Sequence, residues 1–252
     1  MFLRLLKKAV PLPELDAYER YLFIGPHPDD IEMGCAPTVK RLAEAGKTVH
    51  FVVATDGSMG SADPDKTGPS LAKLRQEEAQ ASAKFLGAQE PIFLPFRDAG
   101  FYSVDDLSKA LAVEIVRLKP DIVFASDPDL ACEFHFDHIK TGQAAKAAVF
   151  MTAHEGIMRS MGISGKWQVN ALAFYYTDRP NTFYPVKKWH SIRTEALKLH
   201  PSQFDSKLLH DVTKYFDLRS RRYGLKALKG RCDAFRLYGT SHIHCFPEAM
   251  EY

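Results

Sequence analysis

The stretch "YLFIGPHPDDIEMG", residues 21–34, places a His, two Asp and a Glu directly behind a short apolar run. Residues 20–25 are typical of a buried strand, and residues 36–46 are typical of a helix. The charged residues therefore fall in a strand-to-helix loop. Ligands of open α/β sheets bind beyond the carboxyl ends of the strands, so we expect these side chains to serve a binding site.

The chain beyond this stretch alternates apolar runs with segments of helical period. Predicted strands lie at 47–55, 91–96 and 121–126, and predicted helices at 70–87, 103–120 and 138–153. This alternation is typical of βαβ units, so we predict an α/β fold: a Rossmann-like, mostly parallel sheet with helices on both faces. The pattern loosens after residue 155, which indicates a C-terminal α+β appendage. We interpret residues 1–252 as one domain, with a core at about 20–155 and an extension at about 156–252.

Composition sets limits on the function. The 252 residues are 46% hydrophobic, and the formal charge of +2 indicates no particular partner. We expect no nucleic-acid partner, because the late basic cluster at 219–231 lacks interleaved aromatic and basic residues. We interpret that cluster as a solvated helical face, with anion binding as the alternative. No segment has the apolar length of a membrane span, and the four cysteines show no C-x-x-C spacing. We therefore expect a cytoplasmic protein without a membrane partner.

Two loops carry residues that could hold a metal ion. His27 and Asp30 lie three residues apart in the first loop, and the loop "DPDLACEFHFDH" (127–138) supplies His135, Asp137 and His138. His27, Asp30 and His138 would give three N/O ligands and leave one position open for water. This arrangement is typical of catalytic zinc, and two histidines suit zinc better than magnesium or calcium.

The neighbouring residues indicate hydrolysis. Asp29, beside the metal position, would take a proton from water as general base. His135 would stand opposite and stabilise or protonate the tetrahedral intermediate. Two plainer alternatives remain: a histidine near a strand end is often structural, and Asp29 or Asp30 could cap the following helix. A nucleotide site is disfavoured, because the loop has carboxylates and no G-x-G-x-x-G motif.

The motifs resemble those of a known family. The segments that carry the resemblance are "PHPDDIE" (26–32), "TDGSMGS" (55–61), "LRQEEAQASAKFLG" (74–87), "LPFRDAGF" (94–101), "HFDH" (135–138) and "ALKLHPSQF" (196–204). Together they are similar to the LmbE-like, or PIG-L-like, zinc-dependent N-deacetylases, and most similar to the diacetylchitobiose deacetylases among them. Phe136 departs from the family's H-P-D-H motif, which bears on the shape of that loop. The resemblance implies a Rossmann-like fold, Zn²⁺ at His27, Asp30 and His138, and catalytic roles for Asp29 and His135.

The resemblance also implies substrate contacts. Arg75 and Asp98 correspond to positions that hold sugar hydroxyls, which an Arg fork and a carboxylate suit well. Alternatively, Arg75 could form a surface pair with Glu78, and Asp98 could pair with Arg97 or cap a turn.

The histidines in "TSHIHCF" are harder to interpret. His242 and His244 alternate like strand side chains. They could be structural, or one of them, His242 above all, could complete the substrate site, including that of a neighbouring subunit.

We therefore predict a zinc-dependent hydrolase that removes the acetyl group from a small molecule containing N-acetylglucosamine, either a chitobiose-type sugar or a glycoside conjugate. Alternatives are a zinc-dependent amidohydrolase or esterase with a non-sugar substrate, or a non-catalytic metal-binding protein. The resemblance further implies a homo-oligomer, a trimer or hexamer.

Overall fold

The computed structural model describes residue 5 and residues 8–243. The strands are β1 (Arg20–Gly25), β2 (Thr48–Thr55), β3 (Ile92–Phe96), β4 (Ile122–Ser126), β5 (Ala171–Tyr175), β6 (Thr182–Pro185) and β7 (Cys232–Gly239). The helices are α2 (Asp30–Glu44), α3 (Pro69–Leu86), α4 (Val104–Leu118), α5 (Phe136–Thr152), α6 (Glu155–Ser160), α7 (Ile192–Leu197) and α8 (Ser206–Ala227). Among these helices, none combines the length and apolarity needed to cross a bilayer.

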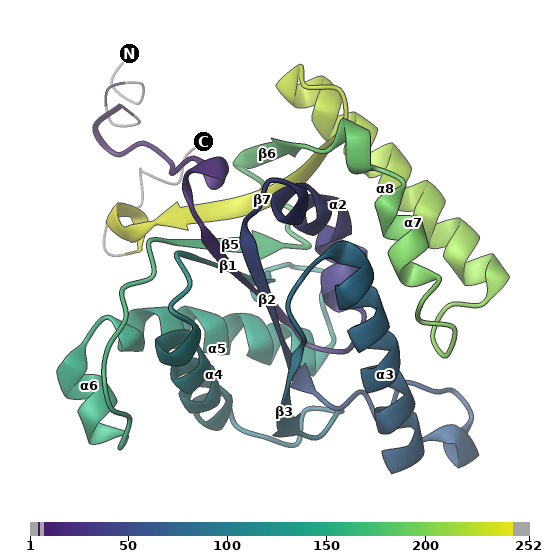
Figure 1. Cartoon of the computed structure of the whole chain (residues 1–252), viewed down its shortest axis with the longest axis horizontal. Coiled ribbons are helices and arrows are strands. Elements are labelled where there is room, and N and C mark those ends of the chain that lie inside the picture. Colours follow the sequence, from purple (N-terminus) through teal and green to yellow (C-terminus); the bar gives the residue numbers. More distant parts are fainter. Residues whose placement is uncertain (1–4, 6–7, 244–252) are drawn as a thin grey trace.

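In the described part of the chain, seven strands form one sheet in the order β3-β2-β1-β4-β5-β7-β6. The pairs β1–β2, β1–β4, β2–β3 and β4–β5 are parallel, whereas β7 runs antiparallel to both β5 and β6. Helices cover both faces of the sheet (Figure 1). The predicted α/β fold with a mostly parallel sheet is confirmed.

The pleat of β1 explains why both faces need helices. Tyr21 and Phe23 point into a core shared with α2, α3 and α7, and the intervening Leu22 and Ile24 point into a second core shared with α4, α5 and α6. Successive strand side chains point to opposite faces, so an uninterrupted apolar strand is stable only between two apolar layers.

The strand order places the functional loops. Chain order runs outward from β1 to β2 and β3 on one side, and from β4 to β5 on the other, so the direction reverses between β1 and β4. At such a reversal the loops after the two strands diverge and leave a crevice in which α/β proteins bind ligands. His27 lies in the loop that follows β1, and His138 lies in the first turn of α5, directly after the loop that follows β4.

Candidate active site

The predicted metal ligands are grouped around Asp30. It is the first residue of α2, and its Oδ2 accepts a hydrogen bond from the backbone N–H of His27 at 3.0 Å. The same oxygen lies 3.1 Å from His27 Nδ1 and 3.3 Å from His138 Nε2. Asp30 and His27 are buried. One carboxylate oxygen therefore faces a nitrogen of each histidine, although His138 lies on another element, α5.

These three side chains fit a metal ion. Donors about 2.0–2.1 Å from a tetrahedral ion lie roughly 3.3 Å from each other, and the two donor separations here are 3.1 and 3.3 Å. All three donor atoms lie within 4.8 Å of one another. The sequence prediction of His27, Asp30 and His138 as a ligand set therefore has the geometry that it requires.

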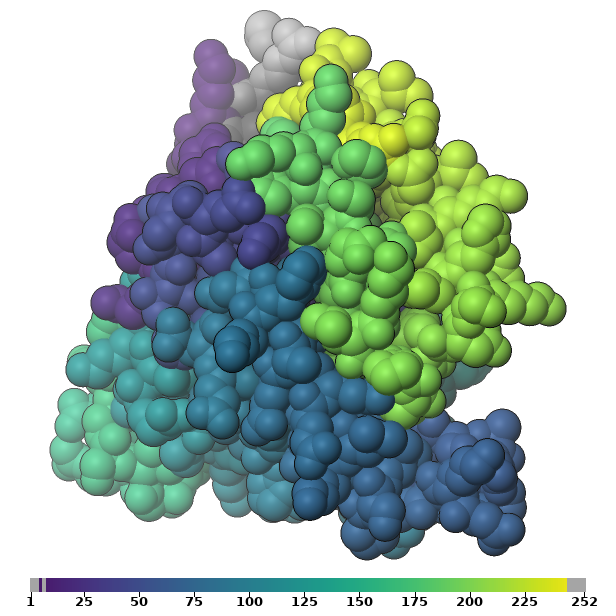
Figure 2. All heavy atoms as spheres, turned by 45° about the vertical axis from the view of Figure 1, so that its right-hand side comes forward, coloured from purple at the N-terminus to yellow at the C-terminus, as the bar shows by residue number. Residues whose placement is uncertain are grey.

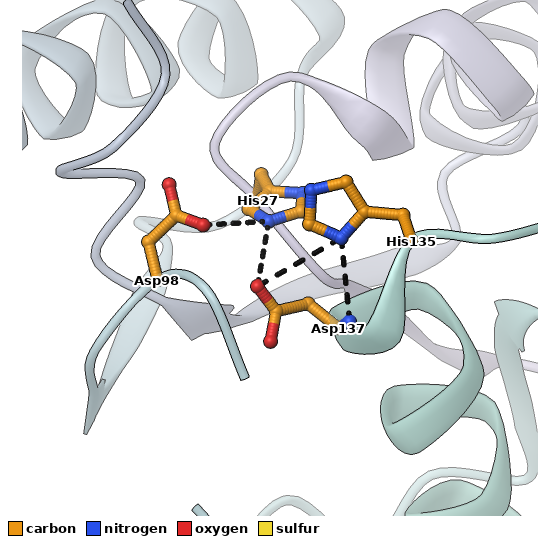
Figure 3. A group of neighbouring side chains, drawn as sticks. All are labelled: His27, Asp98, His135 and Asp137. Atoms are coloured by element: carbon orange, nitrogen blue, oxygen red, sulfur yellow. Dashed lines mark hydrogen bonds and ion pairs between the residues drawn. The ribbon is translucent and has the colours of Figure 1, made fainter. Parts of the chain in front are cut away.

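Carboxylates on the far side of each histidine favour the same conclusion. His138 Nδ1 lies 2.9 Å from Glu133 Oε2. His27 Nε2 lies 3.2 Å from Asp137 Oδ2 and 3.3 Å from Asp98 Oδ1, as Figure 3 shows. A carboxylate that accepts one ring N–H leaves the other nitrogen with its lone pair free for a metal. The free nitrogens are then His27 Nδ1 and His138 Nε2.

A second group of possible ligands, His27, Asp98, His135 and Asp137, lies behind the first. Three of its four side chains already accept hydrogen bonds from backbone N–H groups. Asp137 Oδ2 accepts from Ala99 at 3.0 Å, and His135 Nδ1 accepts from Asp137 at 3.3 Å. Asp98 Oδ2 accepts from the N–H of Met59 at 3.0 Å. This group therefore suits support of His27 better than coordination of its own ion.

Without a metal, the cluster is an ion network. Burial lowers the pKa of His27, but hydrogen bonds with Asp137, Asp30 and Asp98 outweigh it and raise that pKa well above the ordinary value. Burial also opposes the charge of Asp30, yet His138 and His27 hold its pKa well below the usual range. The site thus stabilises positive charge beside Asp30, which is the environment that a cation requires.

Asp29 does not cap α2. Although it occupies the N-cap position, its side chain makes no capping bond, so this sequence alternative is wrong for Asp29. Its Oδ2 instead accepts from Arg75 Nη2 at 3.1 Å. Burial raises the pKa of Asp29, with the charge of Asp30 adding to the rise and Arg75 opposing it. A partly buried carboxylate of raised pKa beside a metal position has the properties of a general base.

Arg75 is buried, not at the surface. Only 3% of the residue is exposed, and its Nη1 donates to the carbonyl oxygen of Gly57 at 2.9 Å. A Cβ at Gly57 or Gly60 would lie 2.8 or 2.2 Å from Nη1, so the two glycines make room for the guanidinium. The alternative that Arg75 forms a surface pair with Glu78 is wrong, because Glu78 instead accepts hydrogen bonds from Ser202. Contact between Arg75 and a sugar stays a prediction.

His135 stands at the open side of the cluster. Its side chain is 47% exposed, and its ring centroid lies 4.6 Å from that of His27 and 5.0 Å from that of His138. Burial and the neighbouring His27 and His138 lower its pKa. The exposed rings of Phe134 and Phe136 flank it. His135 is thus the histidine of the group that a substrate can reach most easily.

Asp98 comes from the loop after β3. It is 4% exposed, and its backbone N–H donates to Asp56 Oδ1, which also accepts from Ser58 N–H. Burial raises the pKa of Asp98, but His27 and the Met59 N–H outweigh burial and lower it. Asp98 therefore faces His27 instead of pairing with Arg97, and its contact with a sugar stays a prediction.

The structure does not bring His242 to this cluster. β7 runs antiparallel to β5 and pairs its last residue, Gly239, with the first residue of β5, Ala171. His242 follows Gly239 and therefore lies near the amino end of β5, whereas the metal loops lie beyond the carboxyl ends of the parallel strands. Its Nδ1 accepts from Gly239 N–H at 3.1 Å, and its Nε2 lies 3.2 Å from the Val10 carbonyl oxygen. Its predicted place in the substrate site of its own chain has no geometric support, and His244 lies outside the described residues.

Two supporting residues were missed. The sequence placed Asp137 in the metal loop without a role, and assigned none to Glu133. The available signal was position: Asp137 directly precedes the ligand His138, and ligating histidines usually donate to a carboxylate. Nothing in the sequence indicated that Asp137, 110 residues from His27, would lie behind that ring.

The fold and this cluster define a family of hydrolases. Residues 22–149 match the model of the PIG-L family, described as GlcNAc-PI de-N-acetylase. The chain is 31% identical over 233 residues to a diacetylchitobiose deacetylase of Thermococcus kodakarensis, covering 92% of this chain and 87% of that protein. The chain belongs to the PIG-L family of deacetylases, as its motifs predicted.

Solved structures agree. The N,N'-diacetylchitobiose deacetylase from Pyrococcus horikoshii superposes with a TM-score of 0.89 at 28% identity, covering 98% of this chain and 94% of that one. The 4-carboxy-2-hydroxymuconate hydratase GalB of Pseudomonas putida has a TM-score of 0.74 at 19% identity, over 88% of this chain and 96% of that one. The second likeness shows the fold alone, since one fold hosts different reactions.

Proposed function

We propose that this protein is a zinc-dependent deacetylase that hydrolyses the acetamide of a small N-acetylglucosamine-containing molecule. The observation that carries the proposal is the convergence of His27, Asp30 and His138 on one point, with the partly buried Asp29 next to them. Acetate release from N-acetylglucosamine glycosides, with and without a chelator, tests it. Acetate release that is unaffected by complete metal removal would contradict it.

His27, Asp30 and His138 would hold the ion. Zn²⁺ bound there would acidify a water molecule and polarise the acetamide carbonyl. Asp29 takes the proton of the attacking water, and its raised pKa makes it a stronger base than an exposed Asp. Arg75 keeps the Asp29 carboxylate in place through the 3.1 Å contact. Asp137 and Glu133 hold the two histidine rings.

His135 is proposed to act on the substrate from the open side. The site needs a donor for the oxygen that gains negative charge, and later for the amine that leaves. Its ring lies against both His27 and His138, so it faces the point where the three predicted ligands meet. Its lowered pKa favours the neutral ring at neutral pH, which can donate from Nε2 while Nδ1 accepts from the Asp137 N–H.

The acetylated sugar is proposed from the relatives. The two most similar proteins reported above are named as diacetylchitobiose deacetylases. We propose that Asp98 accepts from a sugar hydroxyl near His27, and Phe134 and Phe101 are exposed apolar rings that a sugar could cover. A non-sugar amide or ester remains the alternative. Comparing acetate release from chitobiose-type disaccharides with release from simple N-acetyl amines discriminates between them.

The cellular setting is also a proposal. We propose a cytoplasmic homo-oligomer, a trimer or hexamer, without nucleic-acid or membrane partners. Cys35, Cys132 and Cys232 are free thiols, which suits a reducing compartment. Exposed Leu218 and Leu225 on α8 suit contact with another subunit. Sedimentation analysis of the purified protein tests the oligomer.

A further inference from the structure

A groove runs beside the metal cluster. It encloses about 630 Å³ and is lined by His138 and Glu133, by Tyr176 after β5, and by residues of α8. We call it the α8 groove. Figure 2 shows α8 at the surface, with α7 between it and α3. Because His138 belongs both to this groove and to the predicted ligand set, a molecule held at the metal can extend into the groove.

The wall formed by α8 is cationic. Arg219, Arg222 and Lys226 line the groove. Within the described residues, no ion pair joins any of them to a carboxylate, whereas Asp217 of the same helix pairs with Arg221 and Arg231. Arg219 lies 5.6 Å from the Phe216 ring and 5.3 Å from the Tyr223 ring, so aromatic contacts hold its guanidinium in the wall.

Carboxylates of the groove do not neutralise these cations. Glu133 accepts from His138 at 2.9 Å, and Asp178 lies 3.4 Å from Arg179. Among the residues that the structure describes, these three cations therefore share one groove without an anionic partner. For a chain whose formal charge is only +2, this is a local concentration of positive charge.

Tyr176 marks the groove as a functional surface. Its backbone φ of 57° is left-handed, which is uncommon for an aromatic residue. Its hydroxyl donates to the Asp30 carbonyl oxygen at 3.0 Å, and its ring stacks on that of His138 with centroids 6.1 Å apart. Backbone strain of this kind gathers at ligand sites, where the surrounding contacts maintain it. Tyr176 thus joins the metal cluster to the groove.

We infer that the α8 groove binds an anionic substituent on the substrate, a carboxylate or a phosphate carried by the group attached to the N-acetylglucosamine unit. The acetamide lies at the metal, and the attached group runs past Tyr176 to Arg219, Arg222 and Lys226. The inference rests on the proposed function, since it takes the sugar to be bound at the metal. The basic cluster at 219–231 is then partly an anion site and not only a solvated helical face.

Three matched glycosides test whether a negative charge on the attached group strengthens binding. The probes are the para-hydroxymethylphenyl, para-carboxyphenyl and para-phosphophenyl N-acetylglucosaminides, which differ in charge at one position. Binding is measured by calorimetry with zinc-loaded Asp29→Asn protein, so that turnover does not interfere. We expect the anionic probes to bind roughly tenfold tighter than the neutral one at low salt, with the difference shrinking as salt rises. The comparison of the two anionic probes shows which anion the groove prefers.

Matched variants test the location. The double substitution Arg222→Gln/Lys226→Gln should abolish the preference for anions, whereas Lys207→Gln/Lys214→Gln, which removes two other exposed cations of α8, should keep it. Sedimentation confirms that neither pair alters assembly. The inference is overturned if charged and neutral probes bind equally well to the wild-type protein. It is also overturned if both double variants lose the preference for anions to the same extent.

Acetate release by the wild-type protein separates this inference from the proposed function. Release without a preference for anions leaves the function standing and removes the groove's role. A preference for anions without release of acetate supports the groove's role and contradicts the proposed function. No measurable binding of any of the three probes overturns both.

Discussion

The guanidinium of Arg75, on α3, holds the carboxylate of Asp29 at 3.1 Å while it also binds the Gly57 carbonyl oxygen. It therefore ties the proposed general base to the loop after β2. Gly57 and Gly60 leave the space that this guanidinium fills. Arg75 thus acts on the chemistry through Asp29, whether or not a sugar hydroxyl also reaches it.

Replacing Asp29 with Asn should preserve metal content and lower kcat by about 10²-fold or more, the usual scale for a lost general base. The amide keeps the shape of the side chain but cannot take a proton. Metal analysis beside steady-state kinetics checks this. Loss of the metal from this variant would make Asp29 a ligand and exchange the roles of the two aspartates.

Replacing Arg75 with Met should lower kcat more than it raises KM, because Asp29 loses its partner and its orientation. If Arg75 instead served chiefly to hold the sugar, the KM would rise and kcat would change little. Arg97→Met, an exposed arginine nearby, is the control and should leave both constants close to wild type.

Replacing His138 with Ala should remove the metal, since three protein ligands leave no redundancy. Glu133→Gln should retain it with affinity weakened by about 10–100-fold, because Glu133 only orients the His138 ring. Metal content after dialysis against a weak chelator ranks the two variants. Full occupancy in the His138 variant would exclude it as a ligand.

Zinc affinity should fall steeply as pH is lowered. In the metal-free protein the pKa values of both His27 and His138 are raised, since Asp30 and the other carboxylates outweigh burial. Their protons must leave before zinc binds, so affinity increases with pH until the raised pKa values are passed. With two protons displaced, the slope approaches about 100-fold per pH unit. Competition with a chelator across the pH range measures it, and a flat profile would exclude coordination by these histidines.

Replacing Arg193 with Met should destabilise the fold by about 3–5 kcal/mol, because it leaves the buried Asp233 carboxylate without its ion pair at 2.8 Å. Arg193 also donates to the Met33 and Gly34 carbonyl oxygens of α2. Adding Asp233→Asn should restore part of the loss. Denaturant unfolding of Arg193→Met, Asp233→Asn and the double variant checks this, and strict additivity would show that the pair is not coupled.

Much of the fold could be predicted because its signals are local. The apolar run of β1 and the helical period of α3 each lie within one segment, and alternation of such segments implies a parallel sheet. The proposed ligands could be named for the same reason. His27 and Asp30 share one turn, and the loop of His138 follows another strand end, where parallel strands collect their loops.

The buried side of α3 was harder to predict. The helical spacing of Arg75 and Glu78 allowed a surface pair as the alternative to sugar contact by Arg75, yet both residues are buried. Their partners, Asp29 and Ser202, lie 46 and 124 residues away in the sequence. The periodicity of a sequence gives no information about contacts between residues so far apart. A buried charge is tolerated only where the tertiary structure supplies its partner.

The sequence alone determined the βαβ order, the loops that carry chemistry and the His and Asp residues able to bind a metal, because each depends on residues a few positions apart. Only the tertiary structure decided which side chains meet across the loops. It placed Asp137 and Asp98 behind His27 and Arg75 behind Asp29. It also carried His242 to the amino end of β5, away from the metal loops, because β7 runs antiparallel to β5. Strand order and direction set these distances, and both follow from the packing of the whole chain.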